Sequence, residues 1–538
     1  MRKFRSLLAA LVVIAGCAFL GGFYGAGAQG RGAAAVITGE TELTESNQVF
    51  TRVYSAVEEN YADPVSADKA IYQGAIPGML RTLDPHSSFF DPRSYSVNRE
   101  EQRGRYYGVG MTVQAREGKT VVIEPFLGSP AYKAGIRPGD IVSAVDAKST
   151  DGLTTTDVAD MLKGQKGTQV KITLIREGSE RPLEITVTRD EIRRYSVEQA
   201  FEVAPRIAYI KIAGFSNENT YDEMAEDLKK LNAPTLKGMI LDLRENPGGL
   251  LNEGIAVASM FLHKGQLVVS HRGRNSPSKP YYAGNENKGF DFPLVVMMNR
   301  NSASASEIVA GAIQDHDRGL VVGEQSFGKG LVQTVYPLSE NAGLALTTAK
   351  YYTPSGRLIQ RDYTGLSLFD YYYSNRDQAR ANTSHEGQEV KTTDSGRLVY
   401  GGGGITPDVK LDPIKLNRFQ SILAYKDAFF NFGKYYLGIH NSVSRDFKLD
   451  DAALNDFREY LKKDKIPFTE DDLKENHDYL ALGIRANLIS AIYGRGEGDR
   501  IYINNDPWVK SAIDAIPQAD ELAKKVRRIS AQLHPPTD

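Results

Sequence analysis

Residues 293–313 read PLVVMMNRNSASASEIVAGAI, and this stretch decides the fold class. It opens with an uninterrupted apolar run, which is typical of a buried strand. A short polar loop with three serines follows. Beyond it, Ile308, Val309, Ala312 and Ile313 recur at the three- and four-residue spacing of a helix. The stretch therefore predicts one strand–loop–helix unit of an α/β core.

Two further units of the same kind precede it. Residues 207–212 (IAYIKI) predict a strand that is followed by a helix over 220–231, and residues 236–244 (LKGMILDLR) predict another strand. The latter runs into the loop 245–249 (ENPGG) and then into a helical pattern. Strands that alternate with helices form parallel sheets, whose ligands bind at the carboxyl ends of the strands. Residues 195–412 are therefore predicted to form the core.

The composition bounds what else the chain contains. With 538 residues it is too long for one compact core, and about three or four domains are expected. The 65 basic and 67 acidic residues nearly cancel and no long basic run appears, so no nucleic-acid partner is expected. The single cysteine, Cys17, excludes a disulfide framework and a thiolate metal site in the folded part.

The amino terminus has the composition of an export segment. Arg2, Lys3 and Arg5 precede an uncharged stretch over residues 7–28 that ends in Ala-Gly-Ala. Three alternatives are open: cleavage after residue 28, retention as a membrane-spanning anchor, or lipidation at Cys17. Residues 1–28 are thus expected to be a signal peptide or membrane anchor. The protein is expected to be exported, periplasmic or extracytoplasmic, with or without an inner-membrane tether.

Residues 40–98 carry apolar side chains at helical spacing, for example Phe50, Val53 and Val57, and predict a helical segment. Within this segment, residues 83–88 (LDPHSS) place a histidine beside an aspartate and serines. A catalytic triad is disfavoured there, because residues so close in sequence rarely converge, and Asp-Pro is typical of a turn. We therefore interpret residues 83–88 as a turn.

Residues 99–190 change character to short alternating runs. The predicted strands are 108–113, 120–123, 141–145 and 170–175, with one helix over 155–162. The turn-rich stretch 129–142 and the loop Tyr107-Gly108-Val109-Gly110-Met111 resemble a PDZ domain. In such a domain the backbone N–H groups of the loop bind a peptide carboxylate, and the strand that follows accepts the peptide as an added strand. The alternative is a small β-domain that only packs against its neighbours.

The serine loop admits two interpretations. Residues 304–307 (SASE) have the S-x-x-E pattern of an ordinary helix N-cap. A serine at this position also suits acyl transfer, because the N–H of Ala305 can face a developing oxyanion at the helix N-terminus. Gly248 and Gly249, at the end of a neighbouring predicted strand, allow the close backbone approach that a second donor needs.

A hydroxyl nucleophile needs a base, and the histidines stand in no recognisable catalytic context. Lys329 is the better candidate, because the glycines at positions 328 and 330 allow its backbone to approach a serine and no acid is adjacent. Its pKa of about 10.4 must fall toward neutrality, which burial without a carboxylate partner achieves. Serine–lysine pairing is an established variant of the catalytic triad.

Four segments closely resemble signature segments of the carboxy-terminal processing proteases, also called tail-specific proteases: residues 242–249, 301–312, 323–333 and 401–409. The resemblance covers about residues 45–412 and includes the order of helical segment, PDZ domain and protease core. It implies a lysine 25 residues after the nucleophile, and counting back from Lys329 selects Ser304 over Ser302 and Ser306.

By this resemblance Ser304 attacks the peptide carbonyl, Lys329 removes its proton, and Gln333 helps to orient the lysine. Positions four apart in a straight strand lie about 13 Å apart, so Gln333 reaches Lys329 only if the chain bends, as Gly330 would allow. Asp315 matches an acidic position of some relatives, and we interpret it as structural or auxiliary.

The resemblance also implies an oxyanion hole formed by Gly249 and Ala305, with Gly248 as the weaker candidate. It implies a serine endopeptidase that recognises the C-terminal tails of exported proteins through its PDZ domain, with no metal or organic cofactor. Residues 413–538 are predicted to be helical, and they either pack on the core or support the homodimer that flanking helices commonly form in this family. The expected architecture is multidomain α+β, with an α/β protease core, a preceding PDZ β-domain and helical flanks.

Two rival functions fit parts of the chain. Gly323 to Lys329 nearly matches a phosphate-binding loop, but Gly330 replaces the Ser or Thr that holds magnesium, and a β-like sequence follows instead of a helix. The other rival is a catalytically inactive PDZ scaffold that binds protein C-termini. Replacing Ser304 by alanine separates the two, since only a protease would lose hydrolysis.

Overall fold

The structure of the protein is a computed structural model that describes residues 33–284, 290–374, 388–440 and 442–533. The chain contains two compact units, residues 1–79 and residues 80–538. The export segment predicted for residues 1–28 lies outside the described residues. Within the described part, no helix combines the length and the apolar character that a membrane crossing requires.

The first unit is helical in its described part, as the sequence predicts. Helix α2 (Ala33–Asn60) is followed by the π-helix η1 (Asp68–Ala75) and by the start of α3 (Ile76–Arg81). Apolar side chains of α2 such as Phe50 and Val53 are 49% and 58% exposed. These two side chains of α2 are therefore not covered.

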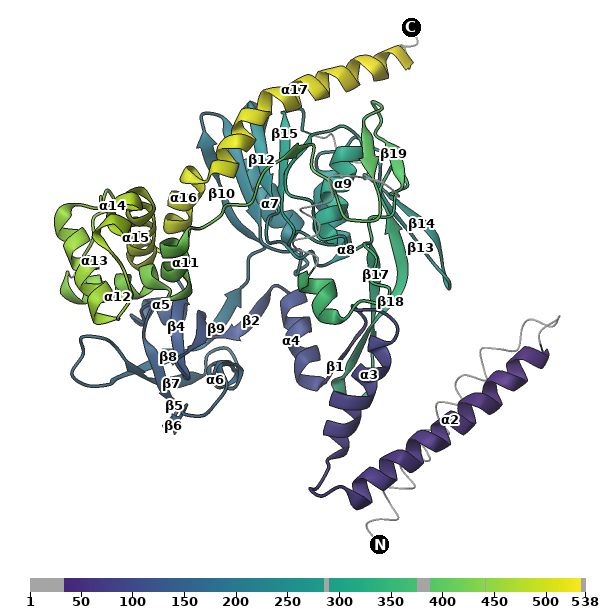
Figure 1. The fold of residues 1–538 in the computed structure, drawn as a ribbon, viewed down its shortest axis with the longest axis horizontal. Coiled ribbons are helices and arrows are strands. Elements are labelled where there is room, and N and C mark those ends of the chain that lie inside the picture. The colour runs from purple at the N-terminus through teal and green to yellow at the C-terminus, as the bar shows by residue number, and fades with distance from the viewer. Residues whose placement is uncertain (1–32, 285–289, 375–387, 441, 534–538) are drawn as a thin grey trace. The chain divides into compact units, whose positions relative to one another are not determined.

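A six-stranded sheet of the second unit has the order β10-β11-β12-β15-β16-β21. Figure 1 labels three of its strands, β10, β12 and β15. Its strands are β10 (Val197–Ala204), β11 (Ile207–Ile212), β12 (Gly238–Asp242), β15 (Leu294–Met298), β16 (Leu320–Gly323) and β21 (Val409–Lys410). β10 is antiparallel to β11, and all other neighbours are parallel. The strand–loop–helix pattern of the sequence thus yields the predicted α/β core.

The two faces of this sheet bury their side chains against different helices, because successive side chains of a strand point to opposite faces. One face packs with three helices: α7 (Thr220–Lys230), α8 (Leu251–Ser259) and α9 (Ala305–Asp315). The other face, which includes Ile240 and Val295, packs against Trp508 and Ile516 of α17 (Pro507–Leu533). The last helix of the chain is therefore part of the core.

A second, five-stranded sheet has the order β1-β18-β13-β14, with β17 also paired to β18. Its strands are β1 (Ser88–Phe90), β13 (Leu267–Gly273), β14 (Ser276–Tyr282), β17 (Leu331–Pro337) and β18 (Gly343–Tyr352). Because β18 pairs with both β1 and β17, it joins the segment that follows the LDPHSS turn to the segment that follows Lys329.

Residues 105–193 form the β-domain that the alternating runs predict. Its strands are β2 (Arg105–Gly108), β3 (Met111–Arg116), β4 (Lys119–Pro125), β5 (Ile141–Val145), β6 (Lys148–Ser149), β7 (Gln169–Ile175), β8 (Leu183–Thr188) and β9 (Asp190–Arg193). Helix α6 (Thr155–Leu162) covers a core that includes Val122 and Ile172. β3 is the terminal strand of its sheet.

Residues 418–505 are helical, as the sequence predicts for this region. The helices are α11 (Arg418–Tyr425), α12 (Ala428–Ile439), α13 (Asp451–Lys463), α14 (Glu470–Glu475), α15 (His477–Tyr493) and α16 (Arg495–Asn505). They enclose a separate apolar core that includes Phe432, Phe457 and Leu480.

Candidate active site

Ser304 stands where the loop after β15 enters helix α9. Its backbone has φ 55° and ψ −114°, a region that residues other than glycine rarely adopt and that costs roughly 1–3 kcal/mol. Sharp strand–turn–helix connections hold nucleophilic serines in such strained turns because the strain exposes the hydroxyl. The N–H of Ser304 donates to Glu307 Oε2 at 2.7 Å. Glu307 of the S-x-x-E pattern thus caps the start of helix α9 through the Ser304 N–H. This bond does not involve the Ser304 hydroxyl, so Ser304 remains a candidate nucleophile.

Hydrogen bonds distinguish the three serines of this loop. Ser302 Oγ donates to Leu243 O at 2.7 Å, and Ser306 Oγ donates to Asn246 O at 3.0 Å. Both hydroxyls therefore tie the loop to the segment that follows β12. The Ser304 hydroxyl donates to no acceptor among the described residues, so its proton is available to a base.

The Gly248-Gly249 turn lies against the Ser304 turn. A Cβ on Gly248 would lie 2.7 Å from Ser304 Cβ and 2.8 Å from Ala305 N, so only glycine allows this approach. The N–H of Gly248 already donates to Asn246 Oδ1 at 2.9 Å. In the described part of the chain, no acceptor engages the N–H groups of Gly249 and Ala305. Of the three predicted donors, these two remain able to bind an oxyanion.

Lys329 lies in the loop between β16 and β17. Burial lowers the pKa of its amine from 10.5, while the carboxylates of Glu307 and Asp84 act in the opposite sense. No acid neighbours Lys329 in the sequence, but the fold brings Glu307 close, and its Oε2 accepts the backbone N–H of Lys329 at 2.9 Å. That carboxylate binds the backbone of the lysine, and no ion pair engages the Lys329 amine within the described ranges. The lowered pKa favours the neutral amine that a general base requires.

Among the described residues, no hydrogen bond joins the Gln333 side chain to Lys329. β17 does bend, through a register shift between Val332 and Gln333, slightly beyond the expected position at Gly330. Gln333 Nε2 donates instead to Thr347 Oγ1 at 3.2 Å. The amide is thereby fixed within the second sheet.

The LDPHSS segment forms the predicted turn. Asp84 Oδ1 accepts the N–H groups of His86 and Ser87, each at 2.8 Å. Ser87 Oγ donates to Asp84 Oδ2 at 2.7 Å and accepts the N–H of Thr347 at 3.1 Å. Because Thr347 also binds Gln333, the turn belongs to the same hydrogen-bonded network as the predicted site.

The His86 imidazole bonds to a distant tyrosine and does not form a triad with Asp84 and Ser87. Burial, followed by the charge of Lys329, lowers its pKa to about 4, so the imidazole is neutral at pH 7. Its Nε2 lies 2.9 Å from the hydroxyl of Tyr371, a residue 285 positions away. Sequence reasoning missed the proximity of this segment to Lys329 because its partners are so distant in the chain.

Asp315 ends helix α9, which Ser304 begins. Its Oδ1 pairs with Arg357 Nη2 at 2.7 Å, and its Oδ2 accepts the N–H of Ser355 at 3.0 Å. Both partners of the ion pair are buried. The carboxylate thus anchors the turn after β18, which favours the structural interpretation of this residue.

The predicted carboxylate loop joins β2 to the terminal strand β3. Gly110 has φ 79°, and a Cβ on it would lie 2.5 Å from Ser129 Cβ. Ser129 Oγ donates to Gly110 O at 2.7 Å, and the N–H of Ala131 donates to Val109 O at 2.8 Å. The carbonyls of Gly110 and Val109 therefore already accept hydrogen bonds. The N–H groups of Val109 and Gly110 have no acceptor among the residues that the structure describes.

The other residues of that predicted loop have different positions. Tyr107 and Gly108 belong to β2, where they pair with Glu191 and Asp190 of β9. Met111 starts β3 and is 8% exposed. Of the five predicted loop residues, only Val109 and Gly110 therefore lie between the two strands.

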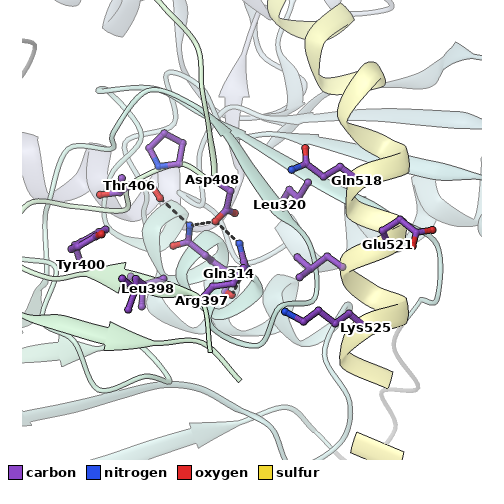
Figure 2. Close-up of a pocket in the computed structure, with 13 residues that line it drawn as sticks. Gln314, Leu320, Arg397, Leu398, Tyr400, Thr406, Asp408, Gln518, Glu521 and Lys525 are labelled. Carbon is purple, nitrogen blue, oxygen red and sulfur yellow. Dashed lines mark hydrogen bonds and ion pairs between the residues drawn. The ribbon is translucent and has the colours of Figure 1, made fainter. Parts of the chain in front are cut away.

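A separate pocket lies between α17 and residues 397–408 (Figure 2). Arg397 there pairs with Asp408, whose Oδ1 also accepts from Gln314 Nε2 at 3.0 Å. Glu521 of α17 lines the other side. The lining includes no residue of the Ser304 and Lys329 loops, so this pocket is distinct from the predicted site.

Three family models match the chain. Residues 125–176 match the PDZ domain, residues 206–366 match peptidase family S41, and residues 419–471 match the C-terminal helical domain of a probable PDZ-protease. Together with the mixed α and β architecture, these matches define the class: a multidomain serine-type protease with a PDZ domain.

The chain is 39% identical over 315 residues to the carboxy-terminal-processing protease of Bartonella bacilliformis, covering 58% of this chain and 72% of the relative. It is 37% identical over 293 residues to the carboxyl-terminal-processing protease of Synechocystis sp., covering 53% and 68%. A solved photosystem II D1 C-terminal processing protease is 29% identical, with 68% and 88% of the two chains covered and a TM-score of 0.36. The chain belongs to the carboxy-terminal processing proteases.

Proposed function

We propose that the protein hydrolyses peptide bonds with Ser304 as nucleophile and Lys329 as general base. One observation carries the proposal: Glu307 Oε2 accepts the N–H groups of both Ser304, at 2.7 Å, and Lys329, at 2.9 Å. Two residues 25 positions apart are thereby backbone neighbours. Burial of the amine lowers its pKa, which favours the neutral form that can accept a proton.

In the proposed reaction, the Lys329 amine takes the Ser304 proton while Oγ attacks the carbonyl carbon of the substrate. The N–H groups of Gly249 and Ala305 stabilise the oxyanion that develops. The Lys329 ammonium then protonates the leaving amine, which releases the carboxy-terminal product and leaves an ester on Ser304. Water that is deprotonated by Lys329 hydrolyses this ester and restores the hydroxyl.

Gln333 enters the proposal as a positioning residue. Its Nε2 is committed to Thr347, while its Oε1 accepts no donor among the described residues. This oxygen is therefore suited to accept a hydrogen bond from the Lys329 ammonium that forms during the reaction. A Gln333→Glu variant would place a carboxylate there and would raise the pKa of the lysine, which a pH profile of kcat/KM can detect.

The proposed substrates are proteins with an accessible, unstructured carboxyl terminus. The N–H groups of Val109 and Gly110 supply donors for the terminal carboxylate, and β3 offers a sheet edge for strand addition. The rival function, an inactive scaffold, would use the same loop without the dyad.

The proposal is tested with a partly unfolded protein whose carboxyl terminus is either free or amidated. We expect the free form to be cleaved faster, and Ser304→Ala and Lys329→Ala to abolish cleavage while tail binding persists. Mass spectrometry of the products maps the cleaved bonds. Equal cleavage of both forms would contradict tail recognition, and cleavage of neither form by the wild type would favour the scaffold.

Export and self-association complete the proposal. Basic residues before the uncharged stretch 7–28 support export to the periplasm or another extracytoplasmic compartment, with or without a membrane tether. The exposed apolar side chains of α2 support pairing of two chains. Cell fractionation and light scattering of the purified protein test these two points, and a cytoplasmic monomer would contradict both.

A further inference from the structure

We propose that Tyr351 is a positioning residue for the reaction: its hydroxyl binds the main-chain carbonyls of Ser304 and Lys329 and so fixes nucleophile and base relative to each other. This inference rests on the proposed Ser304–Lys329 dyad. It assigns a role to a side chain of β18 that touches neither the substrate nor the reacting atoms.

The position of Tyr351 is the first support. The side chain is 1% exposed, and its hydroxyl lies 3.1 Å from Ser304 O and contacts Lys329 O. Its own N–H donates to Gly330 O at 3.0 Å. The residue therefore holds the lysine loop through both its backbone and its side chain.

The protonation state of Tyr351 is the second support. A phenol has one proton to donate, so the two carbonyls share it. Burial raises the pKa of Tyr351 well above its ordinary value of 10. The hydroxyl thus stays protonated and remains a donor over the whole range in which a peptidase works.

Glu307 binds the same two residues through their other main-chain groups. Its Oε2 accepts the N–H groups of Ser304 and Lys329 at 2.7 and 2.9 Å, and its Oε1 accepts from Ser326 Oγ at 2.5 Å and Gly328 N at 2.7 Å. The carbonyls and the N–H groups of both proposed catalytic residues are therefore held, the former by Tyr351 and the latter by Glu307.

The two carbonyls depend on Tyr351 to different degrees. Ser304 O also accepts the N–H groups of Glu307 and Ile308, at 2.8 and 3.0 Å, as the start of helix α9 requires. Among the described residues, Lys329 O accepts from Tyr351 alone. Loss of the hydroxyl should therefore loosen the base and leave the nucleophile in place.

The test compares Tyr351→Phe with Tyr493→Phe in the full chain. Tyr493 is a matched control, since its hydroxyl also donates to a main-chain carbonyl, Val443 O at 2.8 Å, but in the carboxy-terminal helical region. We expect Tyr351→Phe to lower kcat roughly tenfold to a hundredfold, because small misplacements of a catalytic group cost up to about that much. KM should change less than about twofold, and Tyr493→Phe should keep wild-type kinetics.

The pH profile separates positioning from a general loss of stability. A looser lysine is better solvated, so the acid limb of kcat/KM should move to higher pH in Tyr351→Phe and stay in place in Tyr493→Phe. A wild-type kcat and profile in Tyr351→Phe would overturn the inference. Equal losses in the two tyrosine variants, in parallel with their melting temperatures, would overturn it as well.

Three further variants keep the result decisive. If Tyr351→Phe does not fold, Tyr351→Met takes its place, because its flexible side chain fills much of the same space without a hydroxyl and should cause the same fall in kcat and the same shift of the acid limb. Unchanged kinetics in that variant would overturn the inference. Ser304→Ala and Lys329→Ala test the dyad itself, so hydrolysis that survives either change would refute the dyad and not Tyr351 alone.

Discussion

Backbone N–H groups without an acceptor among the described residues lie in two places, the predicted carboxylate loop of the PDZ domain and the proposed oxyanion hole, and both are proposed to bind a carboxyl-derived oxygen. In the loop, the free donors belong to consecutive residues, Val109 and Gly110, and one short turn arranges them. In the core, Gly249 and Ala305 come from separate strand–helix connections, which Ser306 joins through its bond to Asn246 O. The proposed donors for a stable carboxylate thus come from one local turn. The proposed donors for a transient oxyanion come from two loops that only the tertiary structure brings together.

The largest effect is expected from Ser304→Ala, which removes the nucleophile and leaves both sets of N–H donors intact. We expect kcat to fall at least about a thousandfold, as for nucleophiles of serine proteases. The affinity for a free carboxy-terminal tail should stay within about twofold. Hydrolysis assays and fluorescence anisotropy with one labelled tail peptide measure the two quantities. A joint loss of both would show that the two sites are not independent.

Gly248→Ala should damage the oxyanion hole selectively. The new Cβ would lie 2.6 Å from Ala303 O and 2.8 Å from Ala305 N, at φ 94°. The turn that carries Gly249 must then move, and loss of one oxyanion donor costs roughly 10²–10³ in kcat. Gly265→Ala is the matched control, because its φ of 85° is similar but its Cβ meets nothing within 4 Å. Equal losses in both variants would point to backbone strain and not to the collision.

The pH dependence should differ between the two sites. Only the neutral Lys329 amine accepts a proton, so kcat/KM should rise about tenfold per pH unit up to an apparent pKa below 10.5 and then level off. Tail affinity should stay flat from about pH 6 to 9, because the terminal carboxylate is ionised throughout and N–H donors do not titrate. A flat kcat/KM profile across the same range would argue against the lysine base.

The smallest effect is expected from Gly110→Ala in the PDZ loop. The new Cβ would lie 2.5 Å from Ser129 Cβ at φ 79°, which should turn the loop donors away from a carboxylate. We expect tail affinity to fall several-fold and kcat to be preserved, with losses of about tenfold at most. Gly178→Ala, with φ 84° and open space around its Cβ, controls for backbone strain. A fall in kcat with unchanged KM would contradict this assignment.

The sequence predicted the local parts of this site well. Alternating strands and helices were sufficient for the α/β core. The spacing implied by the family resemblance selected Ser304, and the structure gives the hydroxyls of Ser302 and Ser306 to main-chain carbonyls. The role of α17 on the second face of the sheet was not predictable, because an amphipathic helix does not specify which surface covers it.

Contacts between distant segments of the site could not be predicted from the sequence. Glu307 looked like a capping residue, and its bonds to Gly328 and Lys329 depend on how two distant loops meet. Gln333 was expected beside Lys329, but the pairing of β17 with β18 fixes its amide on Thr347. Such pairings depend on register between segments, which local periodicity does not determine.

The place of α17 in the core has a consequence for the timing of synthesis. Trp508 and Ile516 cover the face of the sheet that holds Ile240 and Val295, yet they are made more than 200 residues later than those strands. Because synthesis starts at the amino terminus, this face of the sheet stays uncovered until almost the whole chain has been made. The core of a nascent molecule therefore stays incomplete until α17 has been made, so this face of the sheet can close only at the end of synthesis.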